Sequence, residues 1–197
     1  LIKLGKGDYR LALTGHHIVV DGLSMNLIVR QFAAAYNAQV EGTSMHWDPP
    51  LQYRDYLRWQ AANDFAAPEA YWLEELQGEV PVLELPVDRP QAALRTYRGG
   101  RIALPLEADL FAQVGELSRR QGCTHFMTLF AAYALWLHRI SGQDDLLVGI
   151  PVAGRSLEKG DELVGYCTHL VPVRSRIDWQ QSFVYYLVAV RGKLLRA

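Results

Sequence analysis

The spacing of hydrophobic residues along the chain changes several times, and each change predicts a different structural element. Residues 9–14 alternate larger and smaller side chains, which predicts a strand that ends at Gly15. Residues 23–39 place apolar side chains on one face and polar side chains on another, which predicts an amphipathic helix. A segment with Gly42 and two consecutive prolines interrupts the pattern over residues 41–50, and a subdomain boundary is expected there.

The rest of the chain continues to alternate between helical and strand-like patterns. Four aromatic or aliphatic residues recur at helical spacing within 126–137, with few polar residues between them, which predicts a helix buried on most sides. Asp178, with Gln181 three residues later, predicts a capping box at the start of the last helix. The same criteria predict short helices at 52–63 and 68–77, an extended connection at 80–100, strands at 101–104, 146–150 and 170–173, and an amphipathic helix at 106–117. Strands interleaved with helices place the fold in the α/β or mixed α+β class.

Composition excludes several classes of protein. Half of the residues are apolar and 21% are charged, which is typical of an ordinary globular protein. The 20 basic and 21 acidic residues give a formal net charge of -1, so no nucleic-acid partner is indicated. No apolar stretch reaches the roughly 20 residues that cross a bilayer, so no membrane segment is expected. Two cysteines, Cys123 and Cys167, are too few for a disulfide framework, which favours a reducing, cytoplasmic setting.

The clearest candidate for chemistry lies between the first predicted strand and helix and reads His16-His17-Ile18-Val19-Val20-Asp21-Gly22. Adjacent side chains of a strand point to opposite faces, so only one of the two histidines is expected to face a site. An imidazole titrates near neutral pH and suits general-base catalysis. The same residues are also compatible with two structural histidines followed by an Asp-Gly turn. The histidines and cysteines of the sequence show no metal-ligand spacing, so no metal site is expected.

Further blocks follow this motif along nearly the whole chain. They read Gln52-Tyr53-Arg54-Asp55-Tyr56-Leu57-Arg58-Trp59-Gln60, Leu85-Pro86-Val87-Asp88-Arg89-Pro90, Tyr97-Arg98-Gly99, Val148-Gly149-Ile150-Pro151-Val152-Ala153-Gly154-Arg155 and Leu163-Val164-Gly165-Tyr166. Together with the His-His-x-x-x-Asp-Gly string, their order and spacing resemble the condensation domains of nonribosomal peptide synthetases, the enzymes that assemble antibiotics and other secondary metabolites. A shorter His-x-x-x-Asp core also resembles the wider superfamily of chloramphenicol acetyltransferase.

The resemblance implies a fold of two acetyltransferase-like subdomains that form a V, with the active site in a tunnel. Residues 1–47 would end the N-terminal subdomain and carry the histidine motif, and residues 48–197 would form a truncated C-terminal subdomain. A whole condensation domain is more than twice as long. The resemblance therefore implies that the N-terminal portion of the domain is missing and that the chain alone is inactive.

The resemblance also implies an acyltransferase that forms a peptide bond. Donor and acceptor carrier proteins would each present a thioester on a phosphopantetheine arm, no cofactor would be bound directly, and an adenylation domain would be adjacent. His17 matches the active-site histidine of the family, with His16 beside it. Asp21 would pair with Arg155 and hold the loop in shape instead of orienting the imidazole, and Gly22 would allow close approach of the thioester.

One position departs from the family, and two other functions stay open. His169 stands where the family has an asparagine, in a segment with Tyr166 that lies near the tunnel, so a different donor or acceptor preference is expected. One alternative is an acyltransferase of the same superfamily that uses soluble acyl-coenzyme A, and the later blocks argue against it. The other is a non-catalytic domain of similar fold that recruits a tailoring enzyme, and the intact histidine motif argues against that.

Overall fold

The computed structural model describes residues 1–89, 94 and 98–197. The predicted connection at 80–100 therefore lies partly outside the described residues, as do Pro90 and Tyr97 of the family-like blocks. The chain divides into two compact units, and each unit joins segments that are distant in the sequence. Unit 1 comprises Leu1–Ala67 and Pro151–Leu170, and unit 2 comprises Pro68–Ile150 and Val171–Ala197. The boundary expected after residue 47 concerns subdomains of a larger fold and stays a prediction.

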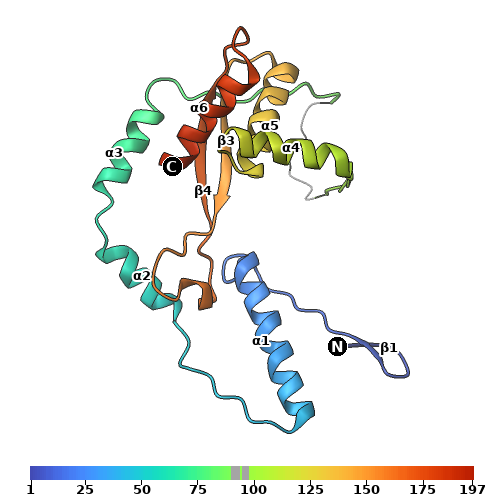
Figure 1. The fold of residues 1–197 in the computed structure, drawn as a ribbon. Coiled ribbons are helices and arrows are strands. Elements are labelled where there is room, and N and C mark those ends of the chain that lie inside the picture. Colours follow the sequence, from blue (N-terminus) through green and yellow to red (C-terminus); the bar gives the residue numbers. More distant parts are fainter. Residues whose placement is uncertain (90–93, 95–97) are drawn as a thin grey trace. The chain divides into compact units, whose positions relative to one another are not determined.

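Unit 1 combines a hairpin with helical elements, which Figure 1 shows along the chain: strands β1 (Ile2–Gly5) and β2 (Asp8–Arg10), helices α1 (Gly22–Glu41) and α2 (Tyr53–Ala62), and the 3₁₀ helix η1 (Gly160–Glu162). The two strands pair antiparallel, with Ile2 opposite Arg10. The predicted helices at 23–39 and 52–63 are confirmed as α1 and α2. Gly42 caps the end of helix α1, where it adopts a left-handed φ of 69° and donates its N–H to the carbonyl of Ala38.

The strand expected at residues 9–14 is wrong beyond Arg10. Residues 11–16 have no regular structure, and Leu11 and Leu13 are 44% and 43% exposed. Alternation of side chains forms a strand only where a neighbouring strand accepts its backbone hydrogen bonds, and none of the described residues supplies that pairing here. The consequence for the site is that the two histidines are not placed by a strand.

Unit 2 contains the larger apolar core. Helix α5 (His125–Ser141) packs against α4 (Ala108–Arg120) and α6 (Phe183–Arg196), while β3 (Asp145–Val152) and β4 (His169–Arg176), most of whose residues belong to unit 2, form a two-stranded sheet. Helix α3 (Ala66–Glu75) begins at the division between the units. These elements confirm the predicted helices and strands at 106–117, 146–150 and 170–173 and the mixed α/β class. The core consists of Phe130, Ala131, Ala134, Leu137, Leu146, Ile150, Val173, Ile177, Tyr186, Leu187 and Val190.

Three expectations in unit 2 are wrong. No strand forms at 101–104, where Ile102 and Leu104 are 89% and 86% exposed. Helix α5 is buried on one face only, because Phe126 and Trp136 remain about half exposed. The last helix begins later than expected, with Ser182 as its N-cap accepting from the N–H of Tyr185 at 3.3 Å. Asp178 instead closes an exposed turn by accepting from the N–H of Gln180.

Candidate functional site

Asp21 caps the start of α1 and is the centre of a buried polar network in unit 1. Its backbone is extended, with φ of -101° and ψ of 179°, and its Oδ1 accepts from the N–H of Ser24 at 2.8 Å. The other carboxylate oxygen accepts from the N–H of Cys167 at 3.2 Å and from the hydroxyl of Thr168 at 3.4 Å. One short side chain therefore joins the start of α1 to a segment about 145 residues later.

Arg155 lies opposite Asp21 in the same network. Its Nη2 donates to Asp21 Oδ1 at 2.7 Å, and the two side chains are 2% and 1% exposed. Its Nη1 donates to the carbonyls of Gly160, the first residue of η1, and Leu163, the residue that caps its end. The structure thus brings together the aspartate and arginine whose pairing the family resemblance implied. A guanidinium that also binds main-chain carbonyls fixes the path of the backbone around it.

Ser24 is a member of this network that sequence reasoning missed. It is fully buried, its Oγ accepts from the N–H of Gly165 at 3.0 Å, and Arg155 donates to it at 2.8 Å. The same Oγ lies 2.7 Å from Asp21 Oδ1 and 2.8 Å from the carbonyl oxygen of Gly165, and either oxygen can accept the hydroxyl proton. A serine three residues after an N-cap aspartate is a signal for local capping. Its long-range partner, Gly165, is visible only in the structure.

The ionisation of Asp21 follows from these contacts. Burial alone would raise its pKa, but hydrogen bonds from Ser24 and Cys167 and the charge of Arg155 outweigh burial. The pKa of Asp21 falls from its ordinary 3.8 to about 2. The carboxylate is therefore charged at neutral pH, and its oxygens are occupied by donors other than His17.

The two histidines lie on a turn that precedes α1. The carbonyl of His16 accepts from the N–H of Val19 at 3.0 Å, and its Nδ1 accepts from the N–H of Ile18 at 3.1 Å. Both histidines are exposed, and no hydrogen bond between described residues joins His17 to Asp21. The premise that a strand directs them to opposite faces is wrong. A turn closed by His16 leaves the His17 ring accessible at the start of α1.

The segment from Gly165 to His169 faces this turn. The rings of Tyr166 and His17 meet edge to face, with centroids 5.4 Å apart and an interplanar angle of 84°. A hydrogen bond of 3.0 Å joins Nε2 of His169 to the hydroxyl of Tyr56, and the tautomer of His169 sets which of the two atoms donates. Gly154 has a left-handed φ of 61°, and a Cβ there would collide with the carbonyl of Cys167 and the ring of His169. The segment is therefore closely packed on both sides.

Gly22 differs from Gly154. It is the first residue of α1, its φ is not positive, and a Cβ there would meet nothing within 4 Å. Neither backbone conformation nor neighbouring atoms of the described chain require a glycine. The close approach of a substrate therefore stays the reason offered for it.

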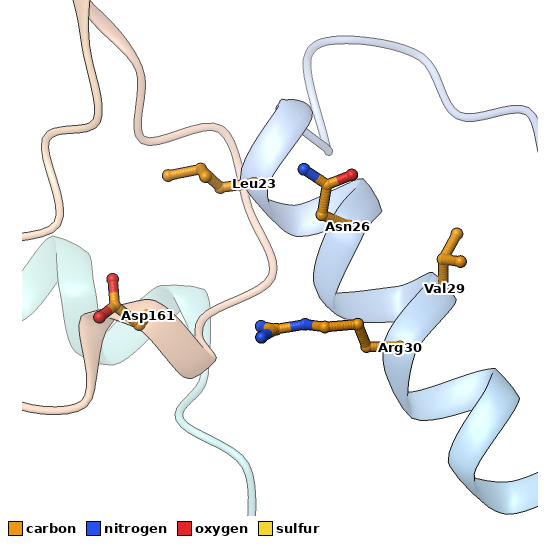
Figure 2. Close-up of a pocket in the computed structure, with 5 residues that line it drawn as sticks. All are labelled: Leu23, Asn26, Val29, Arg30 and Asp161. Atoms are coloured by element: carbon orange, nitrogen blue, oxygen red, sulfur yellow. The ribbon is translucent and has the colours of Figure 1, made fainter.

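A hollow of about 600 Å³ lies along α1, on the side that faces η1 (Figure 2). Its walls are Leu23, Asn26, Val29 and Arg30 of α1 and Asp161 of η1. None of the residues that the sequence singled out for chemistry lines it. In the described part of the chain, no group of three or more histidine, cysteine or acidic side chains is arranged to hold a metal ion.

Comparison with known proteins gives one consistent result. The family model described as "Condensation domain" matches residues 1–197. A linear gramicidin synthase of Brevibacillus parabrevis is 37% identical over 202 residues, which cover all of this chain and 4% of that protein. Phosphinothricin tripeptide synthetase PhsC from Streptomyces viridochromogenes is also 37% identical, with 19% of its length covered.

Solved structures agree in fold. The first condensation domain of the CDA synthetase matches 91% of this chain at 25% identity and a TM-score of 0.68, and the match covers 41% of that chain. The X-domain from teicoplanin biosynthesis matches 92% at 26% identity and a TM-score of 0.78, and 42% of it is covered. The chain thus spans less than half of these structures and a small part of the synthetases. In the described residues, no helix is long and apolar enough to cross a membrane.

Proposed function

Because the chain belongs to the condensation-domain family of nonribosomal peptide synthetases, we propose that it carries the catalytic histidine of a domain that forms peptide bonds. Both substrates are thioesters on the phosphopantetheine arms of carrier proteins, one a donor acyl or peptidyl group and the other an acceptor amino acid. The domain binds no cofactor of its own. The observation that carries the proposal is the exposed His17, set on a turn next to the Asp21–Arg155 pair.

In the proposed reaction, His17 transfers the proton. The acceptor amine attacks the donor carbonyl, the new C–N bond forms, and the C–S bond breaks. The amine proton leaves through His17 and reaches the departing thiolate, so the donor arm ends as a free thiol. General-base assistance of this kind contributes about 10²–10⁴-fold, and positioning of two tethered reactants adds to it.

Asp21 and Arg155 hold the turn and take no part in proton transfer. The geometry supports this role, because the carboxylate is occupied by Ser24, Arg155 and Cys167. This differs from a Ser-His-Asp triad, in which the carboxylate accepts from the imidazole. His16 closes the turn, and His169 with Tyr166 lies where a substrate preference would be set.

The test uses the full-length protein that carries this sequence, with loaded donor and acceptor carrier proteins and mass spectrometry of both carriers. His17→Ala is expected to reduce amide formation by about 10²–10⁴-fold. His46→Ala, which changes another exposed histidine, is the matched control. A rate for His17→Ala within a few-fold of the unchanged protein would overturn the assignment.

The same assay separates the other candidate functions. An acyl-coenzyme A that replaces the donor carrier and supports turnover would favour a soluble acyltransferase. A recruitment domain is supported by the likeness to the teicoplanin X-domain, which has also been solved in complex with OxyB. Capture of a partner enzyme, with no amide formed by the full-length protein, would favour that function.

The context of the chain is part of the proposal. The chain spans less than half of the solved condensation domains, so we expect 1–197 alone to form no amide. Neighbouring adenylation and carrier domains supply the loaded substrates.

A cytoplasmic location is also part of the proposal. It is supported by the small number of cysteines, since Cys123 and Cys167 are both free thiols.

A further inference from the structure

Helix α2 contacts the segment that faces His17, and the contact is specific. The hydroxyl of Tyr53 donates to the main-chain carbonyl of Tyr166 at 2.9 Å. The Tyr53 ring also fills the space beside Gly165, where a Cβ would collide with it. Burial raises the pKa of Tyr53, so its hydroxyl keeps the proton that it donates. Backbone and ring together anchor the segment at Gly165 and Tyr166.

A second tyrosine one helical turn later anchors the other end of the segment. Tyr56 is 1% exposed, and its hydroxyl lies 3.0 Å from Nε2 of His169. The rings of Tyr53 and Tyr56 stack with centroids 5.6 Å apart and an interplanar angle of 28°. Positions i and i+3 of a helix lie on one face. One face of α2 thus contacts the segment at two residues, Tyr166 and His169.

Tyr166 transmits this anchoring to the candidate catalytic residue. Its carbonyl is fixed by Tyr53, and its ring meets the ring of His17 edge to face. Among the described residues, the His17 ring takes part in no side-chain hydrogen bond or ion pair, and the carboxylate of Asp21 is bound by other donors. A shift of the Tyr166 backbone therefore changes the surface against which the imidazole rests.

We propose that Tyr53 is a positioning residue for His17 and acts through Tyr166. The proposal rests on the proposed function for its effect on rate, and it adds a residue of α2 to that site. Tyr53 touches neither substrate nor His17. Its hydroxyl sets the backbone of Tyr166, and the Tyr166 ring sets the orientation of the imidazole toward the reacting amine.

The test has one readout that does not depend on activity. In the full-length protein, diethyl pyrocarbonate labels accessible imidazoles, and the labelling rate of each histidine is read by peptide mass spectrometry. For Tyr53→Phe, labelling of His17 is expected to rise about threefold to tenfold, the range that loss of one hydrogen bond allows. His46 reports general unfolding and should not change. Tyr166→Leu removes the ring but keeps the carbonyl, and it should raise His17 labelling in the same way.

The second readout is single-turnover amide formation between loaded carriers. Tyr53→Phe should lower the maximal rate about threefold to tenfold while KM for the acceptor carrier stays unchanged, since the hydroxyl does not bind substrate. Tyr36→Phe is the matched control, because Tyr36 lies on α1 in the same unit and is 62% exposed. It should leave both readouts unchanged.

The outcomes separate the two proposals. If the unchanged protein forms no amide while Tyr53→Phe still alters His17 labelling, the proposed function fails and the positioning contact stands. If His17 labelling in Tyr53→Phe equals that in Tyr36→Phe, the positioning role is overturned whatever the rates are. In an active protein, a changed label with an unchanged rate also overturns it, because the imidazole then does not depend on Tyr53 for catalysis.

Discussion

Arg155 in unit 1 and Arg174 in unit 2 are both buried arginines paired with an aspartate, yet they stabilise different things. Arg155 faces a carboxylate that is 1% exposed, whereas the partner of Arg174, Asp145, is 35% exposed. Arg174 also donates to the carbonyls of Gln77 and Glu79 and so holds the segment that follows α3. Arg155 holds η1 and the start of α1, where the candidate catalytic histidine lies.

The units around these arginines differ in the same sense. In the described part of the chain, the buried apolar cluster of unit 2 has eleven residues, and that of unit 1 has three, Tyr56, Leu163 and Cys167. Apolar burial stabilises without fixing direction, while hydrogen bonds fix geometry. Burial of apolar surface thus stabilises unit 2, whereas polar contacts hold the candidate site of unit 1 in its geometry. Loss of a polar contact in unit 1 is therefore expected to disturb the histidine turn, whereas loss of an apolar contact in unit 2 is expected to leave that turn unchanged.

The largest effect is expected from Arg155→Ala. It leaves the Asp21 carboxylate buried without its charged partner, which costs about 3–5 kcal/mol. Arg174→Ala should cost less, about 1–3 kcal/mol, because water reaches Asp145. Hydrogen exchange measures both losses of stability: peptides that cover α1 report on Arg155→Ala, and peptides that cover β3 report on Arg174→Ala. Equal protection loss in both variants would remove the distinction between the networks.

A core substitution in unit 2 should lower the stability of the fold without changing the histidine turn. Leu187 is fully buried, and Leu187→Ala is expected to cost about 3 kcal/mol in unfolding free energy while labelling of His17 stays unchanged. Val188→Ala on the same helix is the control, since Val188 is 41% exposed. Enhanced exchange should appear in α5 and α6. Its appearance at the histidine turn would contradict the separation of roles.

Acid should weaken the unit 1 network through Asp21. The folded pKa of about 2 lies below the ordinary 3.8, so the contribution of about 2 kcal/mol is present above pH 4 and is lost as the pH falls toward 2. Urea unfolding between pH 5 and pH 2 measures this slope. Asp21→Asn, which carries no titrating group, should show a smaller slope. The idea fails if both proteins lose stability in parallel.

The smallest effect concerns the start of α6. Ser182→Ala removes the N-cap and should cost about 1 kcal/mol, whereas Asp178→Ala should cost at most about 0.5 kcal/mol, because its bond lies in an exposed turn. Thermal unfolding of both variants measures the difference. A larger loss of stability for Asp178→Ala than for Ser182→Ala would support the capping box at Asp178 that the sequence predicted.

The sequence is sufficient to predict the helices with a long apolar periodicity and the strands with a continuous apolar run. It also determined the family, because the motif blocks follow one another in a fixed order over the whole chain. Asp21 and Arg155 were paired from those blocks, and the structure brings them together. Their roles, and those of His17 and His169, stay predictions until the variants are measured.

The long-range partners of Ser24 and Tyr53 became visible only in the tertiary structure. Ser24 binds Gly165, and Tyr53 binds Tyr166, at separations of 141 and 113 residues. No local pattern encodes such contacts, since a hydroxyl serves equally as a surface group or a buried donor. The same reason explains the errors: residues 9–14 and 101–104 have strand-like alternation, but a strand also needs a paired neighbour. The cap of α6 is Ser182, whereas the spacing of Asp178 and Gln181 indicated an earlier start.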